Sequence, residues 1–141
     1  MSEALDYSST RVGDRYTLEP MTVSRRTLAL YAGASGDHHP VHIDIDEARQ
    51  AGFADVFAHG MLVMAYLGRL LTDCLPQQHL VGFQARFVSI TPVRSTVSCL
   101  AEVIERTDEA GQIRIKLGLS ARDAETGEIR VSATAVLQQP G

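Results

Sequence analysis

The chain has 141 residues, of which 45% are hydrophobic and 21% charged, and its formal net charge is -4. This composition is ordinary for a soluble globular domain, and no Lys/Arg cluster supplies the positive footprint that nucleic-acid binding needs, so nucleic acid is excluded as a partner. The polar N-terminus lacks the order of a signal peptide and no apolar run is long enough for a bilayer, so we expect a cytoplasmic protein that makes no membrane contact.

The N-terminal part of the chain predicts a loose arm followed by a helix, within one domain that spans residues 1–141. Residues 1–12 are rich in Ser, Thr and acidic side chains, which is typical of an unpacked segment. Thr22 or Ser24 is suited to cap a helix through residues 25–32. Two glycines and a proline follow, so the helix is expected to end and a loop to begin.

The middle of the chain predicts a short helix and then a long one. Asp44 or Asp46 is suited to cap the short helix, which includes residues 47–50. The long helix is expected over residues 59–74. Its first two turns, residues 61–67, have no polar face, and a helix that is apolar all round is usually buried.

The C-terminal half predicts strands, because it is rich in Val, Ile, Thr and Phe and partly alternates between apolar and polar residues. The expected strands are residues 80–90, 96–105, 112–122 and 129–137. Turn residues at 108–111 and 125–127 make consecutive strands hairpin neighbours. The predicted class is therefore α+β, with an antiparallel β-sheet around a central buried α-helix. A single sheet around one helix leaves an open face, so self-association is expected.

Residues 34–42, Ala-Ser-Gly-Asp-His-His-Pro-Val-His, carry the chemistry of the chain. They place one carboxylate and three imidazoles in six positions of a loop, where the backbone can direct them to one point. Downstream, Gly60 begins the apolar helix. The first amides of a helix have no partner within it and carry partial positive charge, and a glycine has no side chain to keep a ligand away.

These groups suit the addition of water to an α,β-unsaturated thioester. A carboxylate and an imidazole that share one water, here Asp37 and His42, supply a proton acceptor and a proton source for the α-carbon. The amide of Gly60 supplies a donor for the negative charge that grows on the thioester oxygen. The sequence does not divide the proton transfers between Asp37 and His42, because coupled groups titrate as a pair. We expect Asp37 to take the proton from water and His42 to orient it.

The motif of residues 35–42, followed by His-Gly-Met at 59–61, resembles the (R)-specific enoyl-CoA hydratases, also called MaoC-like dehydratases. The resemblance covers most of the chain and implies a hot-dog fold and a homodimer without a cofactor. It also implies that Asp37 and His42 are catalytic and that Gly60 is the oxyanion glycine. The substrate implied is an enoyl thioester of coenzyme A or acyl carrier protein, hydrated to an (R)-3-hydroxyacyl thioester.

Four further residues are expected to contact substrate. His39 stands where the family has an Asn and is expected to line the site. His59 is expected to stabilise the loop before the long helix and to border the substrate. Met61 and Tyr66 belong to the helix core or border the acyl chain.

Three other interpretations remain open from the sequence. A His-His-x-x-His cluster near two aspartates suggests a metal site, but a proline interrupts it and no fourth ligand has conventional spacing, so none is expected. A thioesterase is the first rival function, because other hot-dog families hydrolyse acyl thioesters. The second is a partner subunit that shapes the acyl tunnel of a heterodimeric dehydratase without chemistry of its own.

Overall fold

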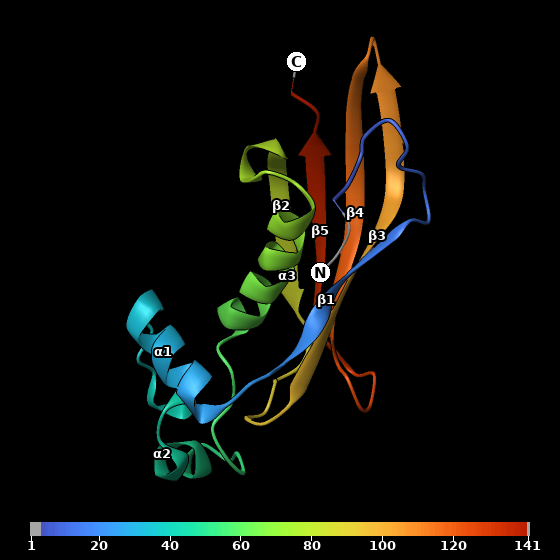
Figure 1. Cartoon of the computed structure of the whole chain (residues 1–141). Coiled ribbons are helices and arrows are strands. Elements are labelled where there is room, and N and C mark those ends of the chain that lie inside the picture. The colour runs from blue at the N-terminus through green and yellow to red at the C-terminus, as the bar shows by residue number, and fades with distance from the viewer. Residues whose placement is uncertain (1–3, 141) are drawn as a thin grey trace.

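The computed structural model describes residues 4–140 and consists of one curved antiparallel sheet packed against a long helix (Figure 1). The strand order is β1-β3-β4-β5-β2. The strands are β1 (Arg15–Thr22), β2 (Leu80–Phe87), β3 (Thr96–Glu109), β4 (Gln112–Asp123) and β5 (Ile129–Gln138). The helices are α1 (Arg25–Ser35), α2 (Ile45–Gln50) and α3 (Gly60–Cys74), with single 3-10 turns at Pro40–His42 and Gln77–His79. The predicted α+β arrangement is confirmed.

Helix α3 forms one side of the core. Leu67 and Leu70 are fully buried, and they pack with the alternating inward residues of β4, such as Ile115 and Leu117. The expected burial on all sides is wrong for the first turn, since Met61 is 55% exposed. The first turn of α3 therefore presents an apolar side chain at the surface of the single chain. Among the described residues, no helix is long and apolar enough to cross a membrane.

The hairpins β3–β4 and β4–β5 form as predicted. At the tip of the first one, Ala110 and Gly111 both have positive φ angles, as a tight two-residue hairpin turn requires. Strand β1 was not predicted. It pairs only with β3, has a register shift between Leu18 and Met21, and contains Pro20, a residue that sheets tolerate at edges and bulges.

Strand β2 ends at Phe87, three residues earlier than predicted. The amides of Val88 and Ser89 both donate to the main-chain carbonyl of Arg130, at 2.9 and 3.2 Å. The side chain of Arg130 is buried and donates to the carbonyl of Ile90 (2.8 Å). Residues 88–90 are thus held by Arg130 in an irregular segment outside the regular sheet pairing.

The expectation of a loose arm over residues 1–12 is wrong for residues 5–10, which are packed, while residues 1–3 lie outside the described part of the chain. Leu5, Tyr7 and Thr10 are buried. The amide of Leu5 donates to the carbonyl of Cys74, and the hydroxyl of Tyr7 lies 3.0 Å from Nδ1 of His79. These contacts attach the segment to the C-terminal end of α3 and the turn that follows it.

Candidate active site

Asp37 follows directly on the end of α1. Of the two predicted caps, Ser24 begins this helix, and Gly36 ends it in the left-handed conformation, with φ of 78°. The chain then reverses, and Ser35 Oγ accepts a hydrogen bond from the Asp37 amide at 3.1 Å. One carboxylate oxygen of Asp37, Oδ1, accepts from the amide of His39 at 3.2 Å. That bond fixes the turn, and the second oxygen of this exposed residue, Oδ2, has no hydrogen-bond partner in the described part of the chain.

His42 lies on the 3-10 turn that Pro40 begins, with its ring half-buried against Phe57. Its Nδ1 lies 2.7 Å from the main-chain carbonyl of Phe57. A carbonyl only accepts, so Nδ1 carries the hydrogen and Nε2 of the neutral ring presents a lone pair. Burial lowers the pKa of His42 below its ordinary value, against an opposing effect of the hydrogen bond to Phe57. The neutral form, an acceptor at Nε2, is therefore favoured.

His59 is the N-cap residue of α3 and is only 1% exposed. Its Nε2 donates to the main-chain carbonyl of Asp37 at 3.0 Å. Its ring stacks on that of His42, with the centroids 4.0 Å apart and the planes inclined by 25°. Tyr31 of α1 also packs edge-on against His59, with the ring centroids 4.9 Å apart. His59 thus connects the start of α3 to both Asp37 and His42.

Asp37, His42 and His59 form one cluster, in which one ligand-type atom of each lies within 4.8 Å of the others. Two acceptors that share a water lie roughly 4 to 5 Å apart, since each hydrogen bond to the water is about 2.8 Å long. The separation of Asp37 and His42 is compatible with that. Among the described residues these three are also the group close enough to hold a metal ion, and they include only His42 of the His-His-x-x-His cluster considered from the sequence. For His59 Nε2 to bind a metal, its bond to the Asp37 carbonyl has to break.

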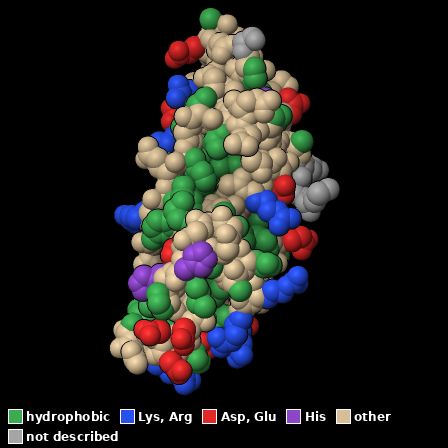
Figure 2. Space-filling model, turned by 90° about the vertical axis from the view of Figure 1, so that its left-hand side faces the viewer, with side chains coloured by type: hydrophobic (Ala, Val, Ile, Leu, Met, Phe, Trp, Pro, Cys, Tyr) green, Lys and Arg blue, Asp and Glu red, His purple; other side chains and the backbone are tan. Residues whose placement is uncertain are grey.

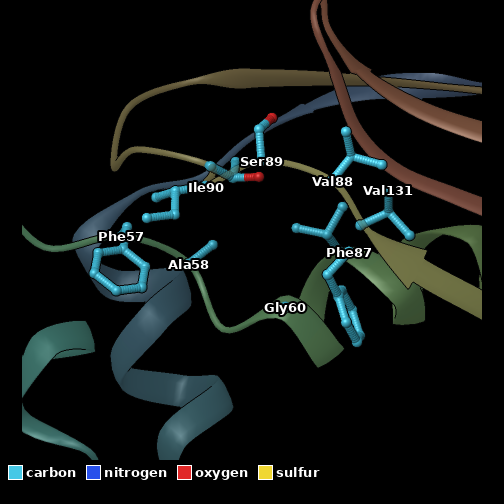
Figure 3. Close-up of a pocket in the computed structure, with 10 residues that line it drawn as sticks. Phe57, Ala58, Gly60, Phe87, Val88, Ser89, Ile90 and Val131 are labelled. Carbon is cyan, nitrogen blue, oxygen red and sulfur yellow. The ribbon is translucent and has the colours of Figure 1, made fainter.

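The first amides of α3, those of Gly60 and Met61, have no hydrogen-bond partner among the described residues. Their N–H groups are therefore available at the positive end of the helix dipole, one residue from His59. Gly60 also allows a close approach: a Cβ at this position would lie 3.0 Å from two ring atoms of Phe87. Figure 3 shows the ring of Phe87 beside Gly60 at the helix start.

A cavity of about 240 Å³ opens between the segment before α3 and the segment after β2 (Figure 3). Its lining is largely apolar and comprises Phe57, Ala58, Gly60, Val63, Phe87, Val88, Ser89, Ile90, Thr91 and Val131. Gly60 and Phe57 join this cavity to the cluster, because Phe57 also bonds His42. The side chains of Asp37 and His42 do not line it.

The other residues that were predicted to contact substrate lie in different environments. His39 is exposed, with its ring edge-on to His42 at 6.1 Å and its Nδ1 accepting from the Val41 amide. Met61 is exposed beside Gly60, whereas Tyr66 is buried in the core and does not line the cavity. The sequence did not predict that the Phe57 carbonyl fixes the tautomer of His42. Every residue has such a backbone carbonyl, so the residue type gives no signal for this interaction.

The surface around this region is mixed in character. Figure 2, which views the molecule from the side of the helices, shows histidine side chains near a group of acidic ones and next to a strip of hydrophobic side chains. Large hydrophobic side chains near the cavity are exposed, namely Met61, Phe87, Val88 and Ile90. An exposed apolar surface beside a cavity is typical of a binding or association surface.

Comparison with known proteins gives consistent matches. A family model described as "MaoC like domain" matches residues 8–124. A mitochondrial 3-hydroxyacyl-[acyl-carrier-protein] dehydratase of Arabidopsis thaliana is 28% identical over 129 residues, which cover 90% of this chain and 77% of that protein. A UPF0336 protein of Streptomyces griseus is 32% identical over 146 residues, covering 95% and 94%. The solved structure of the (R)-hydratase from A. caviae involved in PHA biosynthesis has a TM-score of 0.82 at 25% identity, covering 94% of this chain and 98% of that one.

Proposed function

The chain belongs to the MaoC-like domain family, and from that premise we propose that it reversibly hydrates trans-2-enoyl thioesters to (R)-3-hydroxyacyl thioesters. The observation that carries the proposal is the cluster at the start of α3. It combines a carboxylate, the Nε2 of an imidazole and two helix amides, and neither Nε2 nor these amides have a hydrogen-bond partner within residues 4–140. The similarity to a dehydratase and to an (R)-hydratase supports the reaction class and its stereochemistry.

In the proposed reaction, one water donates its two hydrogens to the acceptors that face it, the free oxygen of Asp37 and Nε2 of His42. Asp37 takes a proton as the water oxygen bonds to C3 of the enoyl group, and His42 orients the water and shares in returning the proton to C2. Water is added across the double bond, so no oxidant, reductant or cofactor is consumed. The two groups act as a coupled pair in these transfers.

Negative charge develops on the thioester oxygen as C3 is attacked, and a donor placed there stabilises the transition state. The Gly60 amide, at the positive end of α3, is the donor that we assign. Loss of one such donor typically costs about 3 kcal/mol of transition-state stabilisation. We assign the apolar cavity beside Gly60 to the acyl chain, and coenzyme A or acyl carrier protein to the carrier.

We also propose that the chain is one domain that works as a homodimer. The exposed hydrophobic side chains near the cavity support this, because a lone chain would leave them in water. Covering them by a second copy would also close off the cavity from solvent. Size-exclusion chromatography with light scattering tests the association directly, with a monomeric mass as the contrary result.

The decisive experiment follows loss of the conjugated enoyl thioester absorbance when purified protein is mixed with crotonyl-CoA. We expect rapid loss with formation of (R)-3-hydroxybutyryl-CoA, and a fall in kcat/KM of about 10²- to 10⁴-fold for Asp37→Asn and His42→Ala. Asp46→Asn is the matched control, since Asp46 is an exposed carboxylate on α2 outside the cluster. It should retain wild-type activity.

Three results would contradict the proposal. Full activity in Asp37→Asn would remove the carboxylate from the mechanism. Release of free thiol from a saturated acyl-CoA, without hydration of crotonyl-CoA, would make the protein a thioesterase. Inactivity of the pure protein, with activity restored by a co-purifying homologue, would make it the partner subunit of a heterodimer.

A further inference from the structure

We propose that His59 is a positioning residue that holds Asp37 and His42 at the separation which one shared water requires. The inference rests on the proposed function and extends it to a side chain that takes no part in the proton transfers. His59 is the N-cap of α3, where a Ser, Thr, Asp or Asn would ordinarily accept a hydrogen bond from the helix amides. Its side chain makes no such bond and is directed to the site instead.

The contacts of His59 reach both members of the pair. Its Nε2 donates to the main-chain carbonyl of Asp37 at 3.0 Å, which fixes the backbone from which the carboxylate extends. Its ring face lies on the ring face of His42, with a centroid distance of 4.0 Å. His42 is also held by the Phe57 carbonyl, whereas Asp37 bonds only within the loop after α1, so without His59 the position of Asp37 relative to His42 depends on that loop. His59 connects both to the start of α3.

The unpaired atom of His59 shows that stability does not account for the residue. With Nε2–H bonded to a carbonyl, Nδ1 of the neutral ring is an acceptor, and it is buried with no hydrogen-bond partner among residues 4–140. A buried polar atom without a hydrogen bond lowers stability and is uncommon in native structures. A Phe at this position would fill similar space without that cost, but it would not bond the carbonyl of Asp37. The donor at Nε2 is therefore the property that distinguishes His here.

His59 also acts on the charge state of His42. The titratable groups that face the His42 ring are Asp37, His39 and His59, and the Phe57 carbonyl accepts from its Nδ1. Burial is the main cause that lowers the pKa of His42, and His59 lowers it further. Because the proposed reaction needs Nε2 of His42 as an acceptor, a lower pKa extends activity to lower pH. Removal of the imidazole at position 59 is expected to raise the pKa of His42.

The test compares His59→Phe, which keeps the ring and loses the donor, with His59→Gln, whose amide places an N–H near the position of Nε2. His79→Phe is the matched control. His79 also stacks on an aromatic ring, that of Tyr7, and its Nδ1 is hydrogen-bonded to the Tyr7 hydroxyl. Both residues lie outside the cluster of Asp37, His42 and His59. Steady-state hydration of crotonyl-CoA over pH 5 to 9 is measured beside thermal unfolding, and the pKa of His42 is measured by NMR.

For His59→Phe we expect kcat to fall by about 10- to 100-fold with KM within about twofold, because misplacement of reacting groups affects the chemical step. The melting temperature should equal or exceed that of the wild type. The acid limb of the pH profile should move to higher pH, together with the NMR pKa of His42. His59→Gln should recover most of kcat, and His79→Phe should keep it.

The proposal is overturned if folded His59→Phe has wild-type kcat and pH profile, or if Gln rescues no better than Phe. It is equally overturned if the loss in kcat only follows the fraction of unfolded protein. Failure of the proposed function is recognised separately, by a wild-type protein that does not hydrate crotonyl-CoA. In that case the NMR measurement still decides: an unchanged His42 pKa in His59→Phe contradicts the coupling of the two rings.

Discussion

The ring of Phe87 lies against Gly60, so closely that a Cβ at position 60 would be 3.0 Å from both Cδ1 and Cε1. The contact joins the end of β2 to the first turn of α3, at the mouth of the cavity. Phe87 is 52% exposed, so its ring can move outward. The absence of a side chain at Gly60 therefore determines where this ring lies and how much space remains next to the helix amides.

Gly60→Ala is expected to impair activity with little effect on stability. The added methyl group pushes the Phe87 ring from its position and narrows the approach to the amide, while an exposed ring adjusts at small energetic cost. We expect kcat/KM for crotonyl-CoA to fall by at least about tenfold and the unfolding free energy to change by under about 1 kcal/mol. Kinetics and urea denaturation measure the two effects. The double variant with Phe87→Ala should regain activity; a double variant as impaired as Gly60→Ala would contradict this account.

The lowered pKa of His42 predicts a pH dependence of stability. An unfolded His binds a proton near its ordinary pKa of about 6.5, whereas the folded protein binds it only at lower pH. The unfolded state therefore holds more protons between these two values, and the unfolding free energy falls as pH decreases through this window. Denaturation at pH 7.5 and 5.5 should show this fall. His42→Phe should reduce this fall in unfolding free energy, whereas His38→Ala, at an exposed position, should leave it unchanged. A fall of the same size in the wild type and both variants would mean that a group other than His42 causes it.

The two ion pairs of Arg130 are expected to contribute unequally to the free energy of unfolding, because one is buried and the other is exposed. Its side chain is 9% exposed and pairs with the poorly exposed Asp123, as well as with Glu128, which is 58% exposed. Arg130→Met leaves Asp123 without this partner and the carbonyl of Ile90 without its donor, so a loss of about 3 kcal/mol is expected. Glu128→Gln should cost under about 1 kcal/mol. Chemical denaturation compares them, and equal losses would contradict the prediction.

Shortening the side chain of Val63 is expected to change the preference for acyl-chain length. It lines the cavity from α3 and is 1% exposed. Val63→Ala should reduce stability by about 1 to 2 kcal/mol, at roughly 0.8 kcal/mol per methylene equivalent, and enlarge the cavity. The ratio of kcat/KM for 2-hexenoyl-CoA over crotonyl-CoA should then rise several-fold. Val103→Ala, equally buried on β3 away from the cavity, should lose similar stability and keep the ratio.

Local patterns in the sequence predicted the elements whose contacts are local. The helix caps at Ser24 and Asp44, helix α3 and the hairpins of β3, β4 and β5 depend on residues near in the chain, and these predictions were confirmed. Strand β1 has only Leu18 buried and contains a proline, so its pattern lacks the alternation that indicates a strand. Its position follows from pairing with β3, in which Arg15 lies opposite Glu102, a residue 87 positions away in the chain.

The site was predictable to the extent that it is a motif. Asp37, His42 and Gly60 stand out by residue type and spacing, and the structure places the first two in one cluster and the third directly after His59. The hydrogen bonds that orient the two imidazoles could not be predicted from the sequence pattern. His42 donates to a backbone carbonyl 15 residues ahead, and His59 donates to one 22 residues behind it. Backbone carbonyls are present at every residue, so only the folded geometry selects these two.

The hairpin turn at Ala110 and Gly111 lies at the far end of the molecule from α1 and α2 (Figure 1). Both residues are exposed, and the strands on either side stay paired up to Glu109 and Gln112. A fluorophore, an affinity tag or a surface tether inserted here would extend from a paired hairpin, away from the cluster of Asp37, His42 and His59. The protein thus offers an attachment point for immobilisation that leaves the end with α1 and α2 free in solution.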